Sequence, residues 1–375
     1  MKPLLRNLVA VAISCSVSVA LAEVLLRLAG IAYPAYYIVD RERGYGLRPG
    51  AEGVWTREGR GQVRINGAGF RGPEVSRQPA PGVLRIAVLG DSFTEALQVD
   101  AAASWVGQLQ SRLQRDPQCR LRQRFPAGVE VLNFGVGGYG TGQQWLTWQH
   151  LAREYRPALV LLALYPGNDF TDNEPIRRND RPVFRIGPDG QLQRDDAFRS
   201  STAYRWRSSL PGQVLDGLIS HSRLLQLLNE AKNRAAAQRP SPATTPGSAP
   251  AAPPPPPLAS GQAWAITEAL LARLAADAAA RGARLAVVST SAPDQVWPRQ
   301  DQRPADPFAQ ERRLATVLAA RRIPYLPLGP ALQRQADAQG LTLHGFARQA
   351  PGQGHWNPTG HRLAAAAIVP WLCGL

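Results

Sequence analysis

The stretch Ala158-Leu159-Val160-Leu161-Leu162-Ala163-Leu164 decides the fold class. It is apolar without interruption rather than alternating, which is typical of a strand buried on both faces of a parallel sheet. Four other short runs have the same strand character, at 84–89, 129–134, 285–290 and 323–328. The last of these contains Pro324 and Pro327, which suit an edge strand because proline cannot donate to a central ladder.

Helical patterns lie between these strands, at about 102–115, 142–154, 262–281 and 307–321. Strands that alternate with helices predict an α/β fold, with a mostly parallel sheet of five strands inside a three-layer αβα sandwich. In such sheets, function resides on the loops at the carboxyl ends of the strands. The residues in those loops therefore carry the functional argument.

The loop after the first strand reads Gly90-Asp91-Ser92-Phe93-Thr94-Glu95. Glycine permits a sharp turn, and a serine at the start of the next helix would be exposed among favourable backbone dipoles. Ser92 and Glu95 also have the spacing of a capping box, so a purely structural N-cap fits the same residues.

Two further strand ends carry groups that could stabilise negative charge. The segment 133–141 is rich in glycine and could offer backbone N–H groups to a ligand, although a plain flexible loop fits equally well. A phosphate-binding loop is disfavoured, because the lysine and the spacing of that motif are missing. Asn168, after the third strand, could donate its side-chain amide to a developing anion or could belong to a simple turn.

The C-terminal motif His355-Trp356-Asn357-Pro358-Thr359-Gly360-His361 precedes an apolar helix at 362–371. A histidine there suggests a general base. His361 is better interpreted as a packing residue at the helix N-terminus. Two histidines six residues apart with no nearby carboxylate make a weak metal site, so neither a metal nor a cofactor is expected.

Taken together, these motifs resemble the SGNH superfamily of GDSL-type esterases over about residues 84–370. The matching residues are Gly90-Asp91-Ser92, Gly138, Gly167-Asn168-Asp169 and His355. The resemblance implies a flavodoxin-like sheet and a serine-dependent acyl transfer. It also extends to membrane-anchored bacterial envelope members, through the apolar N-terminus and the Gly-Phe-Arg-Gly segment at 69–72.

By this resemblance, Ser92 would be the nucleophile and His355 the base that takes its proton and returns it to the leaving group. The backbone N–H groups of Ser92 and Gly138 and the side chain of Asn168 would form the oxyanion hole. A serine hydroxyl needs such a base, because it is a poor nucleophile on its own.

The chain departs from the family pattern in two places. Pro166 stands where the third block usually has glycine. The aspartate that relatives carry two or three residues before the histidine is absent, since those positions are Gln353 and Gly352. The group that orients His355 could then be a backbone carbonyl or one of four side chains: Gln353, Asp169, Asp172 or Asp294.

The function predicted on this basis is an ester hydrolase that removes O-acyl groups from an envelope saccharide or lipid. It would act through a Ser92–His355 dyad and an acyl-enzyme intermediate. One alternative is an O-acetyltransferase of a cell-envelope polysaccharide that uses the same site. The other is a weak or inactive glycan-binding protein with this fold, an idea supported mainly by the missing aspartate.

The N-terminal residues 1–31 predict a signal or anchor segment. Lys2 and Arg6 precede an apolar run, Ala22 ends a small-residue cleavage pattern, and Glu23 and Arg27 would have to lie near a membrane interface. The positive residues favour a cytoplasmic N-terminus. The expected location is a bacterial inner membrane with an extracytoplasmic catalytic domain, or a secreted protein if cleavage occurs near Ala22.

The remaining chain divides into an N-terminal neck or cap at 32–82 and a hydrolase-like domain at 83–375. A proline-rich segment at 238–262 interrupts this domain and predicts a disordered insertion, because it cannot bury enough apolar area to order itself.

The formal charge of +15 invites a nucleic-acid interpretation, which the distribution of the charge argues against. Lysine occurs only at positions 2 and 232, and the arginines are spread along the chain rather than clustered with aromatic residues. We therefore expect no nucleic-acid partner. Cys15, Cys119 and Cys373 are too few and too scattered for a disulfide scaffold, and they leave the redox compartment open.

Overall fold

The computed structural model describes residues 3–174, 180–237, 259–347 and 351–375. Its centre is a sheet of five parallel strands in the spatial order β11-β10-β7-β5-β6. These strands are β5 (Val83–Gly90), β6 (Gly128–Asn133), β7 (Leu159–Leu164), β10 (Arg284–Ser289) and β11 (Tyr325–Pro327). Numbered along the chain, this order is 2-1-3-4-5, that of flavodoxin-like folds. The predicted fold class is confirmed.

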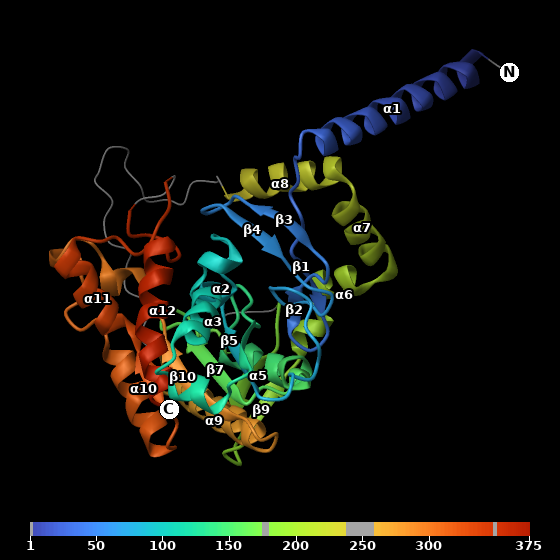
Figure 1. The fold of residues 1–375 in the computed structure, drawn as a ribbon. Helices are drawn as coiled ribbons and strands as arrows, with labels where there is room; N and C mark the ends of the chain where they lie inside the picture. The colour runs from blue at the N-terminus through green and yellow to red at the C-terminus, as the bar shows by residue number, and fades with distance from the viewer. Residues whose placement is uncertain (1–2, 175–179, 238–258, 348–350) are drawn as a thin grey trace.

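Helices cover both faces of the sheet and complete three layers (Figure 1). One face carries α3 (Trp105–Arg115), α11 (Leu328–Gln339) and α12 (Pro358–Cys373). The other carries α5 (Thr141–His150), α9 (Gly261–Ala279) and α10 (Ala309–Ala320). Successive side chains of each strand point to opposite faces of the sheet and pack in two separate hydrophobic cores. Ile86 lies in the core on the first face and Ala87 in the core on the second. This explains why β7 is buried at every residue.

The edge position predicted from Pro324 and Pro327 is observed, because β11 is the outer strand beyond β10. The predicted insertion at 238–262 falls mostly on residues 238–258, which lie outside the described residues. Ala259 and Ser260 are described, and Ser260 is the N-cap of α9, which begins at Gly261. Gly261 and Gln262, the last two residues of the predicted insertion, belong to this helix.

The segment 32–82 forms two small antiparallel hairpins. They are β1 (Tyr37–Asp40) with β2 (Gly44–Leu47), and β3 (Glu52–Trp55) with β4 (Gly61–Arg64). Arg71 fixes this segment to the sheet domain, because its buried guanidinium donates to the carbonyl oxygens of Glu95 (2.8 Å) and Val99 (2.6 Å). The hairpins therefore share an interface with the strand-end loops.

The other elements are shorter or lie at the periphery. They are α1 (Pro3–Leu28), α2 (Ser92–Glu95), α4 (Arg120–Arg124), β8 (Val183–Ile186), β9 (Leu192–Asp195), α6 (Thr202–Ser208), α7 (Leu210–His221) and α8 (Arg223–Ala237).

Helix α1 is one apolar helix of 26 residues that extends away from the body (Figure 1). By length and hydropathy it could cross a membrane, and none of its most apolar window is buried against the protein. This agrees with a signal or anchor segment at the N-terminus.

A disulfide joins Cys119, which precedes α4, to Cys373 at the end of α12. The two cysteines are 254 residues apart, so their spacing in the sequence gave no indication of pairing. Cys15 on α1 is an exposed free thiol. The chain thus contains a single cross-link among its described residues rather than a disulfide scaffold.

Candidate active site

Ser92 is the first residue of α2, directly after the buried strand β5. Its N-cap is Asp91, whose carboxylate accepts a hydrogen bond from the Phe93 N–H at 2.9 Å. The N-cap therefore lies one residue before Ser92, the N-cap of the predicted capping box. Because Asp91 caps the helix, the Ser92 hydroxyl is left for another partner.

That partner is His355, whose Nε2 lies 2.8 Å from the Ser92 Oγ. The two residues are 263 positions apart in the sequence. Ser92 follows β5 in the first third of the chain, whereas His355 lies near the C-terminus, just before α12. Both are partly exposed, so a substrate can reach the hydroxyl from solvent. The structure therefore brings together the two residues on which the predicted chemistry depends.

The other ring nitrogen of His355 meets a residue that sequence reasoning missed. Nδ1 lies 2.5 Å from Oε2 of Glu58, and the backbone N–H of His355 donates to Oε1 at 2.7 Å. One carboxylate thus holds both the ring and the main chain of the histidine. Glu58 is therefore the group that contacts Nδ1 of His355. The sequence had left this role to a backbone carbonyl or to one of four side chains: Gln353, Asp169, Asp172 or Asp294.

Glu58 lies in the loop of the β3–β4 hairpin, in the segment interpreted as a neck. Gly59, which follows it, has φ +65°, and a Cβ there would come within 2.4 Å of the Gln98 carbonyl oxygen and 2.8 Å of the Phe346 ring. Only glycine fits such a close left-handed turn. Arg57, on the other side, donates to the Glu230 carboxylate of α8 at 2.8 Å.

The four predicted orienting groups have other places in the structure. The Asp169 carboxylate accepts from the Gln144 side chain and the Tyr165 N–H, each at 2.9 Å. Asp172 accepts from the Asn168 side chain at 2.7 Å. Asp294 is buried in a 3₁₀ turn after β10, and Gln353 is half-buried two residues before the histidine, without a hydrogen bond to its ring.

The negatively charged groups around His355 make its imidazole a stronger base. Burial alone would lower the pKa of His355, but the hydrogen bond and charge of Glu58 outweigh it and raise that pKa above its usual value. Asp91 and Glu95 add to the negative field around the ring. Burial in turn raises the pKa of both Asp91 and Glu95.

The predicted oxyanion donors lie in α2 and in two loops, each following a strand at the same end of the sheet. The Ser92 N–H belongs to the first turn of α2, where backbone N–H groups have no partner within the helix. Gly138 has φ +75° in the glycine loop, and its neighbour Gly137 lies so close to Glu95 that a Cβ would meet the carboxylate at 2.8 Å. That loop therefore packs directly on α2.

Asn168 lies in the loop after β7, and its Nδ2 donates one hydrogen bond to Asp172. An amide nitrogen carries two hydrogens, so the second remains for a ligand. Pro166, the departure from the family pattern, is buried next to this loop and leaves Asn168 half-exposed.

The remaining histidines of the motif region have structural positions. His361 is buried at the start of α12, its Nδ1 accepts from the Trp105 N–H at 3.3 Å, and burial lowers its pKa to about 3. His344 is buried beside Trp356, and burial lowers its pKa to about 4. Among the described residues, no group of three or more His, Cys, Asp and Glu side chains could hold a metal ion.

A hollow of about 360 Å³ adjoins Glu58. It is lined by Thr56, Arg57, Glu58, Gly59, Arg60, Phe346 and Ala347. The hairpin that supplies the carboxylate to His355 thus also supplies most of the lining of this hollow.

Neither a family model nor a curated protein sequence matches the chain. The solved structures similar to this chain include acetyl xylan esterases and a putative lipolytic protein of the G-D-S-L family. TesA is 18% identical, with a TM-score of 0.39 over 77% of this chain and 97% of its own. A variant of Axe2, an acetyl xylan esterase from Geobacillus stearothermophilus, is 10% identical, with a TM-score of 0.39 over 79% of this chain and 97% of its own. A putative lipolytic protein of the G-D-S-L family from Desulfitobacterium hafniense DCB-2 is 11% identical, with a TM-score of 0.36 over 77% and 99%.

The five-stranded parallel sheet flanked by helices is a feature of this chain's own structure, and neighbours at 10–18% identity say nothing of its activity. The activity of this chain therefore has to be inferred from its own residues.

Proposed function

We propose that this chain is a serine-dependent ester hydrolase with a Ser92–His355–Glu58 triad. The observation that carries the proposal is the unbroken line of contacts from the Ser92 Oγ through both ring nitrogens of His355 to the Glu58 carboxylate. This is the arrangement in which a base activates a hydroxyl and a carboxylate holds the base in the right tautomer.

The reaction would proceed in two halves. The Ser92 Oγ attacks the ester carbonyl carbon while its proton passes to Nε2 of His355. The tetrahedral intermediate then expels the alcohol, which takes that proton from His355. Water attacks the acyl-enzyme in the same way, and its proton passes through His355 to the leaving Ser92 oxygen, so that the free acid departs.

Glu58 would act at both stages without changing its own protonation. Its carboxylate accepts a hydrogen bond from Nδ1–H, which leaves Nε2 unprotonated to accept the proton of Ser92, and its charge stabilises the imidazolium that forms. The Ser92 and Gly138 N–H groups and the Asn168 amide would face the carbonyl oxygen as its charge develops.

We infer that the substrate is an O-acyl group on a saccharide or lipid of the cell envelope. Two features support a site outside the cytoplasm: the apolar α1 and the Cys119–Cys373 disulfide, a bond typical of oxidising compartments. By the positive-inside bias, Lys2 and Arg6 support an anchor that leaves the domain outside a bacterial inner membrane.

Labelling with a fluorophosphonate and hydrolysis of p-nitrophenyl acetate test the proposal on the full chain in detergent. We expect labelling at Ser92 and loss of both signals in Ser92→Ala. A folded protein that neither labels nor hydrolyses would instead be a binding protein. Acylation of an added sugar hydroxyl without release of free acid would point to a transferase.

A further inference from the structure

The exposed large apolar side chains of the described residues gather in two places. One is α1 with the adjoining Ile31. The other is the helical segment α6–α8, with Trp206, Leu210, Val214, Leu215, Leu218 and Leu228. Apolar side chains that cluster on a surface are normally covered, so we expect another molecule or a membrane to cover this second group.

Four of the six residues in this second group lie on α7. Leu210, Val214 and Leu218 follow one another at intervals of four residues, so they share a helix face, and they are 78%, 62% and 55% exposed. Trp206 on α6 is 55% exposed. We refer to these four residues with Leu215 as the α7 apolar surface. Asp216 on the same helix pairs with Arg48 at 2.6 Å, which fixes α7 to the β1–β2 region.

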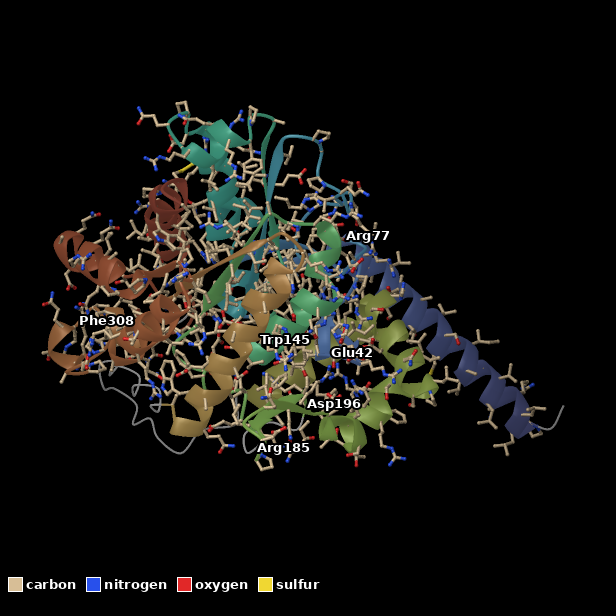
Figure 2. The ribbon with its side chains drawn as sticks, turned by 90° about the horizontal axis from the view of Figure 1, so that it is seen from below. Glu42, Arg77, Trp145, Arg185, Asp196 and Phe308 are labelled. Carbon is tan, nitrogen blue, oxygen red and sulfur yellow. A yellow bond between two sulfur atoms is a disulfide. The ribbon has the colours of Figure 1, made fainter. Side chains whose placement is uncertain are left out.

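The candidate membrane helix is joined to α7 and α8 at one point. The Glu23 carboxylate of α1 accepts hydrogen bonds from the Arg223 N–H (2.9 Å) and the Leu224 N–H (3.0 Å), at the start of α8. Arg27 donates to the carbonyl oxygen of His221, the last residue of α7, at 2.7 Å. In Figures 1 and 2, α1 extends from the side of the molecule where α7 lies.

These contacts determine what would cover the surface. If α1 crosses a bilayer, the polar residues Glu23 and Arg27 lie at its boundary, because they are costly inside the membrane. The α7–α8 junction, which binds both residues, then lies at the bilayer surface. The α7 apolar surface would therefore face lipid rather than open water.

The composition of the surface fits a membrane interface. A helix with leucine and valine on one face and a neighbouring tryptophan is typical of segments that lie in the headgroup region. Arg205 and Arg207 flank Trp206 and are exposed. Arginines there would attract anionic headgroups, while their aliphatic stems cover apolar area.

We propose that α6 and α7 form a lipid-contact surface that rests on the anionic bilayer surface beside α1. The anchor and this surface would together hold the catalytic domain in one orientation, where a single transmembrane helix would leave it free to rotate.

The test uses the full chain in nanodiscs of phosphatidylcholine and phosphatidylglycerol. In a Cys15→Ser background, Val214→Cys carries an environment-sensitive fluorophore, and Ala338→Cys on α11, which is exposed and distant from α1, carries the control label. We expect the label at 214 to shift to the blue and to be quenched at least threefold more by spin-labelled lipids than the label at 338.

Equal quenching at both positions would overturn the proposal. So would a label at 214 that is shielded from water but not quenched, in particles containing two chains, because the occupant would then be a second copy. Adding Leu210→Glu and Leu218→Glu to the 214-labelled chain should abolish the quenching. Unchanged quenching in pure phosphatidylcholine would overturn the preference for anionic lipid.

Discussion

A histidine can serve as a base for serine only if its far nitrogen is held in the protonated form. In this chain the holder is a glutamate 297 residues away, which binds the ring and the backbone N–H of His355 with separate oxygens. The Glu58 side chain is only 12% exposed, so little water competes for these bonds. Such a carboxylate fixes position, tautomer and charge together.

Glu58→Gln should lower kcat for p-nitrophenyl acetate by about 100-fold or more, since an amide neither stabilises the imidazolium nor enforces one tautomer. The acidic limb of the pH–rate profile should also move. Glu58 raises the pKa of His355, and the base must be neutral to act, so removing the charge shifts that limb to lower pH.

Glu52→Gln provides the matched control, because Glu52 is exposed on the same hairpin. It should retain both the rate and the pH profile of the native chain. If Glu58→Gln kept the native rate, or if the acidic limb of its pH–rate profile stayed at the native pH, Glu58 would be only a structural partner of His355.

Asn168→Ala should lower kcat by about 100-fold with little change in KM, because the amide would act on charge that develops after binding. The circular dichroism spectrum and the melting temperature should stay native, since the side chain is half-exposed. A native kcat would remove Asn168 from the oxyanion hole.

The residues of the site were predictable to different degrees. Ser92, Gly138 and Asn168 follow three strands, and parallel strands bring their carboxyl ends to one edge, so the sequence indicates their convergence. Glu58 follows no such rule. It lies in a short hairpin without periodicity, and the missing aspartate near His355 was the only sign that a distant carboxylate was needed.

At the scale of elements, the β3–β4 hairpin must be rigid for Glu58 to act, yet it is small. Its support comes from α8, whose Glu230 side chain is 5% exposed and pairs with Arg57, next to Glu58. A displacement of about 1 Å at a catalytic group can cost roughly 100-fold in rate. The pair between the hairpin and the helix is therefore a positioning contact.

Glu230→Gln should lower kcat roughly tenfold, because a weaker bond to Arg57 lets the hairpin drift. The informative measurement is the double variant with Glu58→Gln. If Glu230 acts only through Glu58, the double variant should be no slower than Glu58→Gln alone. If the fold-losses in kcat of the two single variants multiply in the double variant, Glu230 acts independently of Glu58, for example by shaping the hollow beside Arg57.

The elements that the sequence predicted well are the buried ones. All five strands of the central sheet were expected within one or two residues. The inner strands β5, β7 and β10 are covered on both faces and are therefore apolar almost throughout. Helices α6–α8 and α11 were not predicted. The apolar residues Leu210, Val214 and Leu218 of α7 do recur at helical spacing, but their stripe faces outward rather than the core.

At the scale of the whole molecule, one series of contacts runs from α1 to the candidate Ser92–His355 pair. Glu23 of α1 binds the start of α8, Glu230 of α8 binds Arg57, and Glu58 binds His355. The segment 32–82 thus supplies part of the candidate site and also its link to α1. We expect the neck and the sheet domain to be functional only together.

The disulfide acts at the other end of the same assembly. It ties Cys373, in the helix that follows His355, to Cys119, which is fully buried. Without it, the last helix would depend on packing alone. Cys119→Ala with Cys373→Ala should therefore lower the free energy of unfolding by about 2–5 kcal/mol, since a cross-link over so long a loop restricts the unfolded chain.

Thermal melts of the full chain in detergent, with and without reductant, measure this effect. Reductant should lower the melting temperature of the native chain toward that of the double variant and leave the variant unchanged. Cys15→Ser is the control, and it should melt like the native chain because that thiol is exposed and unpaired. Identical melts of the native chain in both conditions would mean that the cross-link does not stabilise the fold. The attachment of α12, and with it the placement of His355, would then rest on the buried contacts between α12 and α3.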